Sequence, residues 1–165
     1  MTDLESLVGE FDSEMRGTRR MLERIPRERY DWRPHAKSFS IGHLAAHIVD
    51  SVDWVEHILA REEFEFDPKT YKTSEGASLD ALLAKFDDRV AAGKRILAGL
   101  DEAAIASHWR LTVLGTVRVD RPKAAAIRDF TLSHVIHHRG QLSVYLRLLD
   151  VPVPGVYGPS ADEQG

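Results

Sequence analysis

Histidine is the residue type in this chain best suited to chemistry, because the sequence has eight histidines and no cysteine. His134 and His138 stand four residues apart. At this spacing on a helix, two β-carbons lie about 5 to 6 Å apart on the same face. Both imidazole rings can therefore reach one ion, since neutral imidazole is a common metal ligand. With thiolate ligands excluded, the pair predicts a metal site whose ligands are imidazole nitrogens.

A third ligand is needed, because two protein ligands rarely hold a metal ion. His47 lies on the edge of the apolar stripe of a helix predicted over residues 41–61. From there its ring can reach the same ion, while other coordination positions stay open for water or substrate. His43, four residues earlier, is the alternative or an additional ligand. Its place on the flank of the stripe is typical of a partly exposed side chain, so the pattern favours His47.

Further polar residues follow the histidine pair closely in the sequence. Gln141 lies one turn beyond His138 and can hydrogen-bond a ligand ring, a bound substrate or a neighbouring helix. His137 lies roughly a hundred degrees around the helix from His138, where a structural hydrogen bond or a subunit contact is expected. Arg139 can reach a carboxylate on a neighbouring helix or subunit, and Gly140 permits close helix approach. The spacing assigns no role to His35, His57 and His108.

Four helices are predicted to position these residues. Apolar residues recur at alternating steps of four and three over residues 4–25, 41–61, 79–100 and 127–149. Residues able to cap a helix precede three of these segments: Thr2, Ser38 or Ser40, and Ser78. In the last segment the inward row passes through Thr131, His134 and His138, at positions that are normally hydrophobic. An unsatisfied buried polar group costs about 1 to 3 kcal/mol, and metal coordination of the rings would remove this cost.

The segments between the helices are predicted to be irregular or extended. The period changes to two on either side of Leu114 and Gly115, which predicts a short β-hairpin over residues 107–120 before the last helix. Residues 61–77 form a long polar connection between the second and third helices, and the Pro- and Gly-rich residues 151–165 form an extended C-terminal arm. The predicted fold class is all-α, a four-helix bundle with residues 1–165 as one domain.

Composition narrows the range of partners. The chain has 22 basic and 26 acidic residues, a net charge of −4, and the two signs are interspersed. No broad positive face is expected, so nucleic acid is a poor candidate partner. The apolar runs are shorter than the ~20 residues that cross a bilayer, and the N-terminal residues lack a basic segment followed by a hydrophobic one. A cytoplasmic location without a membrane partner is the expectation.

Three segments resemble motifs of a known family. Residues 134–141, HVIHHRGQ, resemble the fourth-helix signature of the DinB (damage-inducible) family of bacterial metal-binding four-helix bundles. Residues 40–48, SIGHLAAHI, are similar to its second-helix motif, and residues 153–163, VPGVYGPSADE, to its C-terminal arm. The resemblance implies that His47, His134 and His138 bind zinc, nickel or a similar divalent ion, and that the protein forms a homodimer. Related bundles include S-transferases and isomerases that use low-molecular-weight thiols, so such a thiol is an implied cofactor.

Two functions follow from such a site. Three neutral nitrogen ligands leave the charge of a divalent ion undiminished, and the pKa of a zinc-bound water falls to ~7 in favourable sites. The first hypothesis is therefore a metal-dependent transferase or hydrolase that activates a thiol or water for transfer to a small electrophilic molecule. The alternative is a non-catalytic stress or interaction protein with a structural metal, because the motifs hold no obvious acid, base or nucleophile beyond the ligands. A third reading leaves the histidines hydrogen-bonded in the core without an ion.

Overall fold

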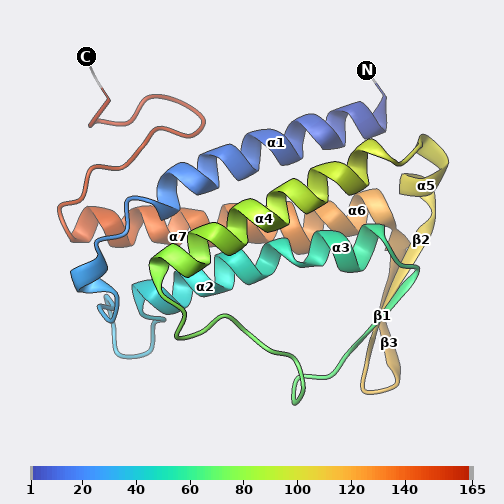
Figure 1. The fold of residues 1–165 in the computed structure, drawn as a ribbon, viewed down its shortest axis with the longest axis horizontal. Helices are drawn as coiled ribbons and strands as arrows, with labels where there is room; N and C mark the ends of the chain where they lie inside the picture. Colours follow the sequence, from blue (N-terminus) through green and yellow to red (C-terminus); the bar gives the residue numbers. More distant parts are fainter. Residues whose placement is uncertain (1, 164–165) are drawn as a thin grey trace.

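The structure, a computed structural model, describes residues 2–163 and is mostly helical, with a small three-stranded sheet at one end (Figure 1). Residues 1, 164 and 165, which end the predicted domain and arm, lie outside the described residues. The helices are α1 (Asp3–Leu22), the 3-10 helix η1 (Arg27–Arg29), α2 (Ile41–Val52), α3 (Trp54–Leu59), α4 (Leu79–Ala98), α5 (Glu102–Ala106), α6 (Lys123–Ile127), the π-helix η2 (Arg128–Ser133) and α7 (His134–Leu148). The strands are β1 (Glu63–Phe66), β2 (His108–Val113) and β3 (Thr116–Pro122).

The predicted helix starts are confirmed by their caps. The Thr2 hydroxyl accepts a hydrogen bond from the Glu5 amide at 3.2 Å, and the Glu5 carboxylate accepts one from the Thr2 amide at 2.8 Å. This reciprocal pair satisfies two of the amides that the first turn of α1 leaves free. Ser40 caps α2, and Ser78 caps α4. These local signals fix where α1, α2 and α4 begin.

The main helices α1, α2, α4 and α7 lie side by side (Figure 1). Helix α2 packs against α4 and α7, and α1 packs against the same two helices. Between them lies one cluster of buried apolar side chains, which includes Phe11, Leu44, Ile48, Phe86 and Leu142. This packing puts the inner face of α2 next to α7, where the candidate ligands lie. Within residues 2–163, no helix has both the length and the apolarity that crossing a bilayer requires.

Two segments differ from the predicted organisation. The helix expected over residues 41–61 is interrupted at Asp53, whose amide donates to the carbonyl of Asp50, three residues back, at 3.1 Å. The polar connection contains strand β1, which pairs in parallel with β2 and extends the predicted hairpin to a three-stranded sheet. The hairpin itself is present, and Leu114 and Gly115 have φ angles of +48° and +77° in its turn. The partner of β1 lies more than 40 residues further along the chain. The residues near β1 in the sequence therefore do not indicate this pairing.

The inward row predicted for the last helix is wrong beyond Thr131. The buried positions there are instead Val135, Arg139, Leu142 and Leu146. The reason is the π-helix η2, in which hydrogen bonds join residues five apart and each turn holds more residues than an α-helical turn. The wider turn rotates every later side chain around the axis. His134 and His138 are therefore half-buried on the flank of α7 rather than on its core-facing side.

Candidate metal centre

Three histidines converge between α2 and α7. His47 comes from α2, and His134 and His138 come from the first turns of α7. Each offers one ring nitrogen, and these three nitrogens lie within 4.8 Å of one another. The Nε2 atoms of His47 and His134 are 2.9 Å apart. Nitrogens that bind one zinc ion at about 2.0 to 2.1 Å in tetrahedral geometry are separated by about 3.4 Å, so small ring rotations suffice for this trio to hold an ion.

The electrostatic surroundings of the three rings also suit metal binding. Burial is the largest cause of a lowered pKa at His47, at His134 and at His138. The pKa of His134 falls to about 4, because the nearby rings of His138 and His47 add to the effect of burial. All three imidazoles are therefore neutral at neutral pH, and neutral imidazole is the form that carries a lone pair for a metal ion.

Gln141 orients one of these rings. Its Oε1 lies 2.8 Å from Nδ1 of His138, and its Nε2 lies 3.1 Å from Nε2 of His137. A proton on Nδ1 of His138 that is donated to the amide oxygen leaves Nε2 as the lone-pair atom. The predicted hydrogen bonds from Gln141 to a candidate ligand ring and from His137 to a neighbour are both present. Partners of this kind fix the tautomer and direction of a ligand ring.

Loss of this contact is expected to weaken metal binding. Gln141→Leu removes the acceptor for Nδ1 of His138, and we expect the affinity for zinc to fall by about tenfold, at the lower end of the usual effect of such partners. Competition with a chromophoric chelator measures the change. Ser143→Ala is the control, because Ser143 lies on the same helix and its hydroxyl donates to the carbonyl of Gly140, away from the histidine rings. Equal zinc affinity for wild type and Gln141→Leu would contradict an orienting role.

The remaining histidines lie outside the cluster. The ring of His43 stacks on Phe39 with 4.0 Å between centroids, and its Nδ1 is 3.2 Å from a carboxylate oxygen of Glu75. This is the partly exposed flank position that the sequence indicates. His108 is exposed and pairs with Asp120, and His35 is exposed. His57, to which the spacing assigns no role, is half-buried and stacks on Phe64 with 4.1 Å between centroids.

A cavity of about 420 Å³ adjoins the histidines. Its lining comprises His47, Asp50, Ser51, Trp54, Phe66, Tyr71, Thr73, Phe130 and His134. The sequence offers no spacing that joins these residues, since they come from α2, α3, β1, the segment before α4, η2 and the start of α7. A small molecule in this cavity would lie next to His47 and His134.

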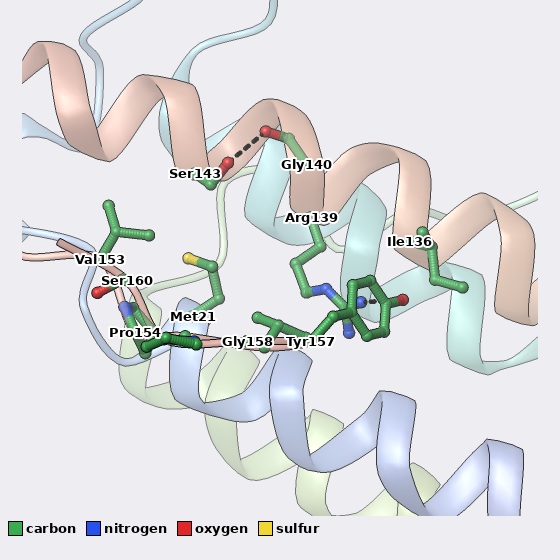
Figure 2. Close-up of a pocket in the computed structure, with 13 residues that line it drawn as sticks. Met21, Ile136, Arg139, Gly140, Ser143, Val153, Pro154, Tyr157, Gly158 and Ser160 are labelled. Carbon is green, nitrogen blue, oxygen red and sulfur yellow. Dashed lines mark hydrogen bonds between the residues drawn. The ribbon is translucent and has the colours of Figure 1, made fainter. Parts of the chain in front are cut away.

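Arg139 has a structural role next to the cluster. Its side chain is 4% exposed, and Nη2 donates to a carboxylate oxygen of Glu14 on α1 at 2.7 Å. The same nitrogen lies 2.7 Å from the hydroxyl of Tyr157 in the C-terminal arm, and Figure 2 shows the guanidinium beside the Tyr157 ring. The predicted contact of Arg139 with a carboxylate on a neighbouring helix is confirmed. It ties α7, α1 and the arm together.

The close helix approach expected at Gly140 is wrong, and the crowded glycine beside Arg139 is Gly17, which faces the C-terminal arm. At Gly140 a β-carbon would meet nothing within 4 Å, so this position is not where the helices touch. At Gly17 of α1 a β-carbon would lie 2.9 Å from Val156 and 3.1 Å from the guanidinium of Arg139. The described part of the arm, residues 151–163, has no helix or strand, as predicted. Its groove against α7 is lined by Met21, Ile136 and Pro154, among others (Figure 2).

Metal binding by these rings is expected to depend on pH. A proton competes with the ion for the same nitrogen only at a pH near or below the pKa of that ring. Because burial lowers the pKa of all three rings, and that of His134 to about 4, affinity should hold at pH values where an ordinary histidine of pKa ~6.5 is already protonated. It should then fall steeply toward pH ~4. Zinc retained after dialysis over this range measures it, and undiminished retention at pH ~4 would contradict ligation by histidine.

Comparison with known proteins places the chain in a family. It is 26% identical over 148 residues to YjoA of Bacillus subtilis (strain 168), an alignment that covers 89% of this chain and 91% of YjoA. The crystal structure of YjoA, a DinB-like protein, matches with a TM-score of 0.68 at 20% identity, over 97% of this chain and 99% of YjoA. A DinB-like protein from Bacillus cereus ATCC 10987 matches with a TM-score of 0.72 at 20% identity, over 93% and 97% of the two chains. These two structures show a shared fold, and the family profile of DinB matches residues 1–164. The chain belongs to the DinB family.

Proposed function

We propose that this protein is a four-helix bundle that binds one divalent metal ion, zinc or nickel, through His47, His134 and His138. In this proposal it is a metal-dependent transferase or hydrolase, which activates a thiol or water for transfer to a small electrophilic molecule. The observation that carries the proposal is the approach of three ring nitrogens to within 4.8 Å of one another beside a cavity. A low-molecular-weight thiol as cosubstrate and a homodimer are parts of the same proposal.

In the proposed reaction, different residues bind the ion, orient its ligands and exclude water. A divalent ion with three neutral nitrogen ligands supplies a Lewis acid that lowers the pKa of a bound water or thiol. His47 and His134 line the cavity, so an ion held by their ring nitrogens would adjoin it. Gln141 keeps the ring of His138 in one tautomer and direction. The aromatic side chains of the cavity exclude water from the reacting molecule, which strengthens the electrostatic interactions there.

A screen of thiols against electrophiles tests the activity. The protein is purified without a nickel column and reconstituted with zinc or nickel, and we expect a thiol–electrophile pair whose turnover falls at least about a hundredfold in His138→Ala. His108→Ala is the control, because this histidine is exposed and pairs with Asp120 on the hairpin. Equal rates in wild type and His138→Ala would contradict chemistry at the metal.

One observation favours the non-catalytic alternative as a second candidate. The three rings come from two different helices, α2 and α7, which pack against each other. An ion held there would cross-link the two helices and stabilise the folded chain. Under this alternative, chelation lowers the melting temperature strongly and the screen finds no turnover. An unchanged melting temperature after chelation would exclude a structural role for the metal.

A further inference from the structure

Besides the two histidines, four of the nine residues that line the cavity carry aromatic side chains. Trp54 lies on α3, Phe66 on β1, Tyr71 in the segment before α4 and Phe130 in the π-helix η2. Trp54 is central to them, with ring centroids 5.5 Å from Phe130 and 6.2 Å from Phe66. The rings of Phe66 and Tyr71 lie 5.1 Å apart. Flat, polarisable surfaces of this kind stack well against another planar ring.

The wall is supported from behind. Trp109, which is fully buried, packs edge-on against Trp54 with 6.2 Å between ring centroids. The indole nitrogen of Trp109 donates to the carbonyl of His57 at 3.0 Å, which fixes its orientation. Phe130 also contacts Trp109, at 5.7 Å. Trp54 and Phe130 are therefore held by the protein core and do not depend on a ligand for their positions.

The side chains that line the cavity offer no free charge to a ligand. Asp50 is the one charged side chain among the described residues that line it. One carboxylate oxygen of Asp50 accepts from the Ser74 hydroxyl at 2.5 Å and from the ammonium group of Lys85 at 2.8 Å, and the other accepts from the Ser74 amide at 2.7 Å. Burial, aided by Asp53 and Asp50, raises the pKa of Tyr71 to about 12, so its phenol is neutral too. Without a metal ion on the histidines, an anionic ligand finds no countercharge among the lining side chains, and a cation finds a carboxylate whose partners are already present.

The same contacts of Asp50 set the shape of the cavity. Asp50 lies three residues after His47, and its bonds to Ser74 anchor the segment that carries Tyr71 and Thr73. Lys85 on α4 also bonds the hydroxyl of Ser74, at 2.9 Å. The segment over residues 67–77 is thus attached to the helix that carries a candidate ligand. This attachment holds Tyr71 and Thr73 beside the helix that carries His47.

We propose that the cavity binds an uncharged aromatic compound, whose ring stacks among Trp54, Phe66, Tyr71 and Phe130 and whose polar end faces His47 and His134. This assigns an aromatic body to the electrophile, and in that respect the inference rests on the proposed function. The volume of about 420 Å³ is at the lower end of the range of small-molecule sites. Compounds with one to three aromatic rings fit this space.

A matched pair of fluorescent probes tests the cavity itself. N-phenyl-1-naphthylamine is neutral, and 8-anilinonaphthalene-1-sulfonate is the same skeleton with one sulfonate. We expect saturable binding of the neutral probe to the purified protein, at least about tenfold tighter than binding of the sulfonate. The comparison is made on protein from which metal has been removed by chelation, so that no bound ion attracts the sulfonate. Equal affinity for the two probes would overturn the proposal.

Three variants locate the probe. Thr73→Trp places a large side chain on an exposed position of the cavity wall and should weaken binding of the neutral probe at least about tenfold, as should Phe130→Ala. Phe39→Ala is the matched control, because this aromatic ring lies 5.8 Å from that of His47 but does not line the cavity. Undiminished binding to Thr73→Trp would overturn the proposal, and this variant leaves the buried core intact.

A second measurement tests the direction of the polar end. In cobalt-loaded protein, 4-phenylimidazole should perturb the visible absorption of the ion at concentrations at least about tenfold below those needed for imidazole. Phe130→Ala should remove this preference, and equal potency of the two compounds in wild type would overturn the proposed orientation. Failure of cobalt to bind at all would instead contradict the proposed function, while the probe titrations would still decide the nature of the cavity.

Discussion

Replacing His134 with alanine is expected to lower the affinity of the protein for zinc or nickel by more than about a hundredfold. The ring of His134 supplies one of three converging nitrogens, and its Nε2 faces that of His47 at 2.9 Å. Loss of a residue that only orients a ligand already costs about 10- to 100-fold in affinity, and loss of the ligand itself should cost more. Metal content after dialysis, together with competition against a chromophoric chelator, measures the effect.

The control for this experiment is His43→Ala. His43 lies one turn before His47 on α2, but its ring stacks on Phe39 and faces Glu75 instead of the cluster. Its removal should leave metal affinity within experimental error. A loss in His43→Ala as large as in His134→Ala would assign His43 to the metal site, and unchanged affinity in His134→Ala would contradict the site altogether.

Replacing Arg139 with methionine is expected to lower the free energy of unfolding by about 3 to 5 kcal/mol, the usual cost of leaving one partner of a buried ion pair without the other. The side chains of Arg139 and Glu14 are 4% and 13% exposed. Water therefore has little access to the Glu14 carboxylate once the guanidinium is removed. At about 2 to 4 °C per kcal/mol for a domain of this size, the melting temperature should fall by roughly 6 to 20 °C. Thermal and urea unfolding measure it.

Two further variants separate the causes of this loss. Arg147→Met removes a surface pair with Asp162 in the same C-terminal arm, and its effect should be much smaller because both partners are solvated. Arg139→Met combined with Glu14→Gln should be less destabilising than Arg139→Met alone, since no unpaired carboxylate is then buried. If Arg139→Met and wild type have the same melting temperature, the ion pair does not hold α1, α7 and the arm together.

The sequence predicted those structural features that depend on residues close together in the chain. The caps at Thr2, Ser40 and Ser78 and the hairpin turn at Leu114 involve residues a few positions apart, so their chemistry is readable in order. The predicted inward row of the last helix was wrong, but His134 and His138 still lie on one face, as their spacing predicted. Both residues follow the π-helix, so the rotation that it introduces moves the two rings together and keeps them on one face.

Tertiary packing decided the features that join distant segments. The sequence by itself determined the helical segments, the candidate histidines and the family resemblance, because each is written in a short stretch of residues. Three features became visible only in the tertiary structure. They are the pairing of β1 with β2, the bond of Arg139 to Glu14, 125 positions away, and the cavity lined by Trp54 and Phe130. Such contacts depend on how helices rotate and pack, and a single π-helical turn changes that rotation without changing the apolar pattern that precedes it.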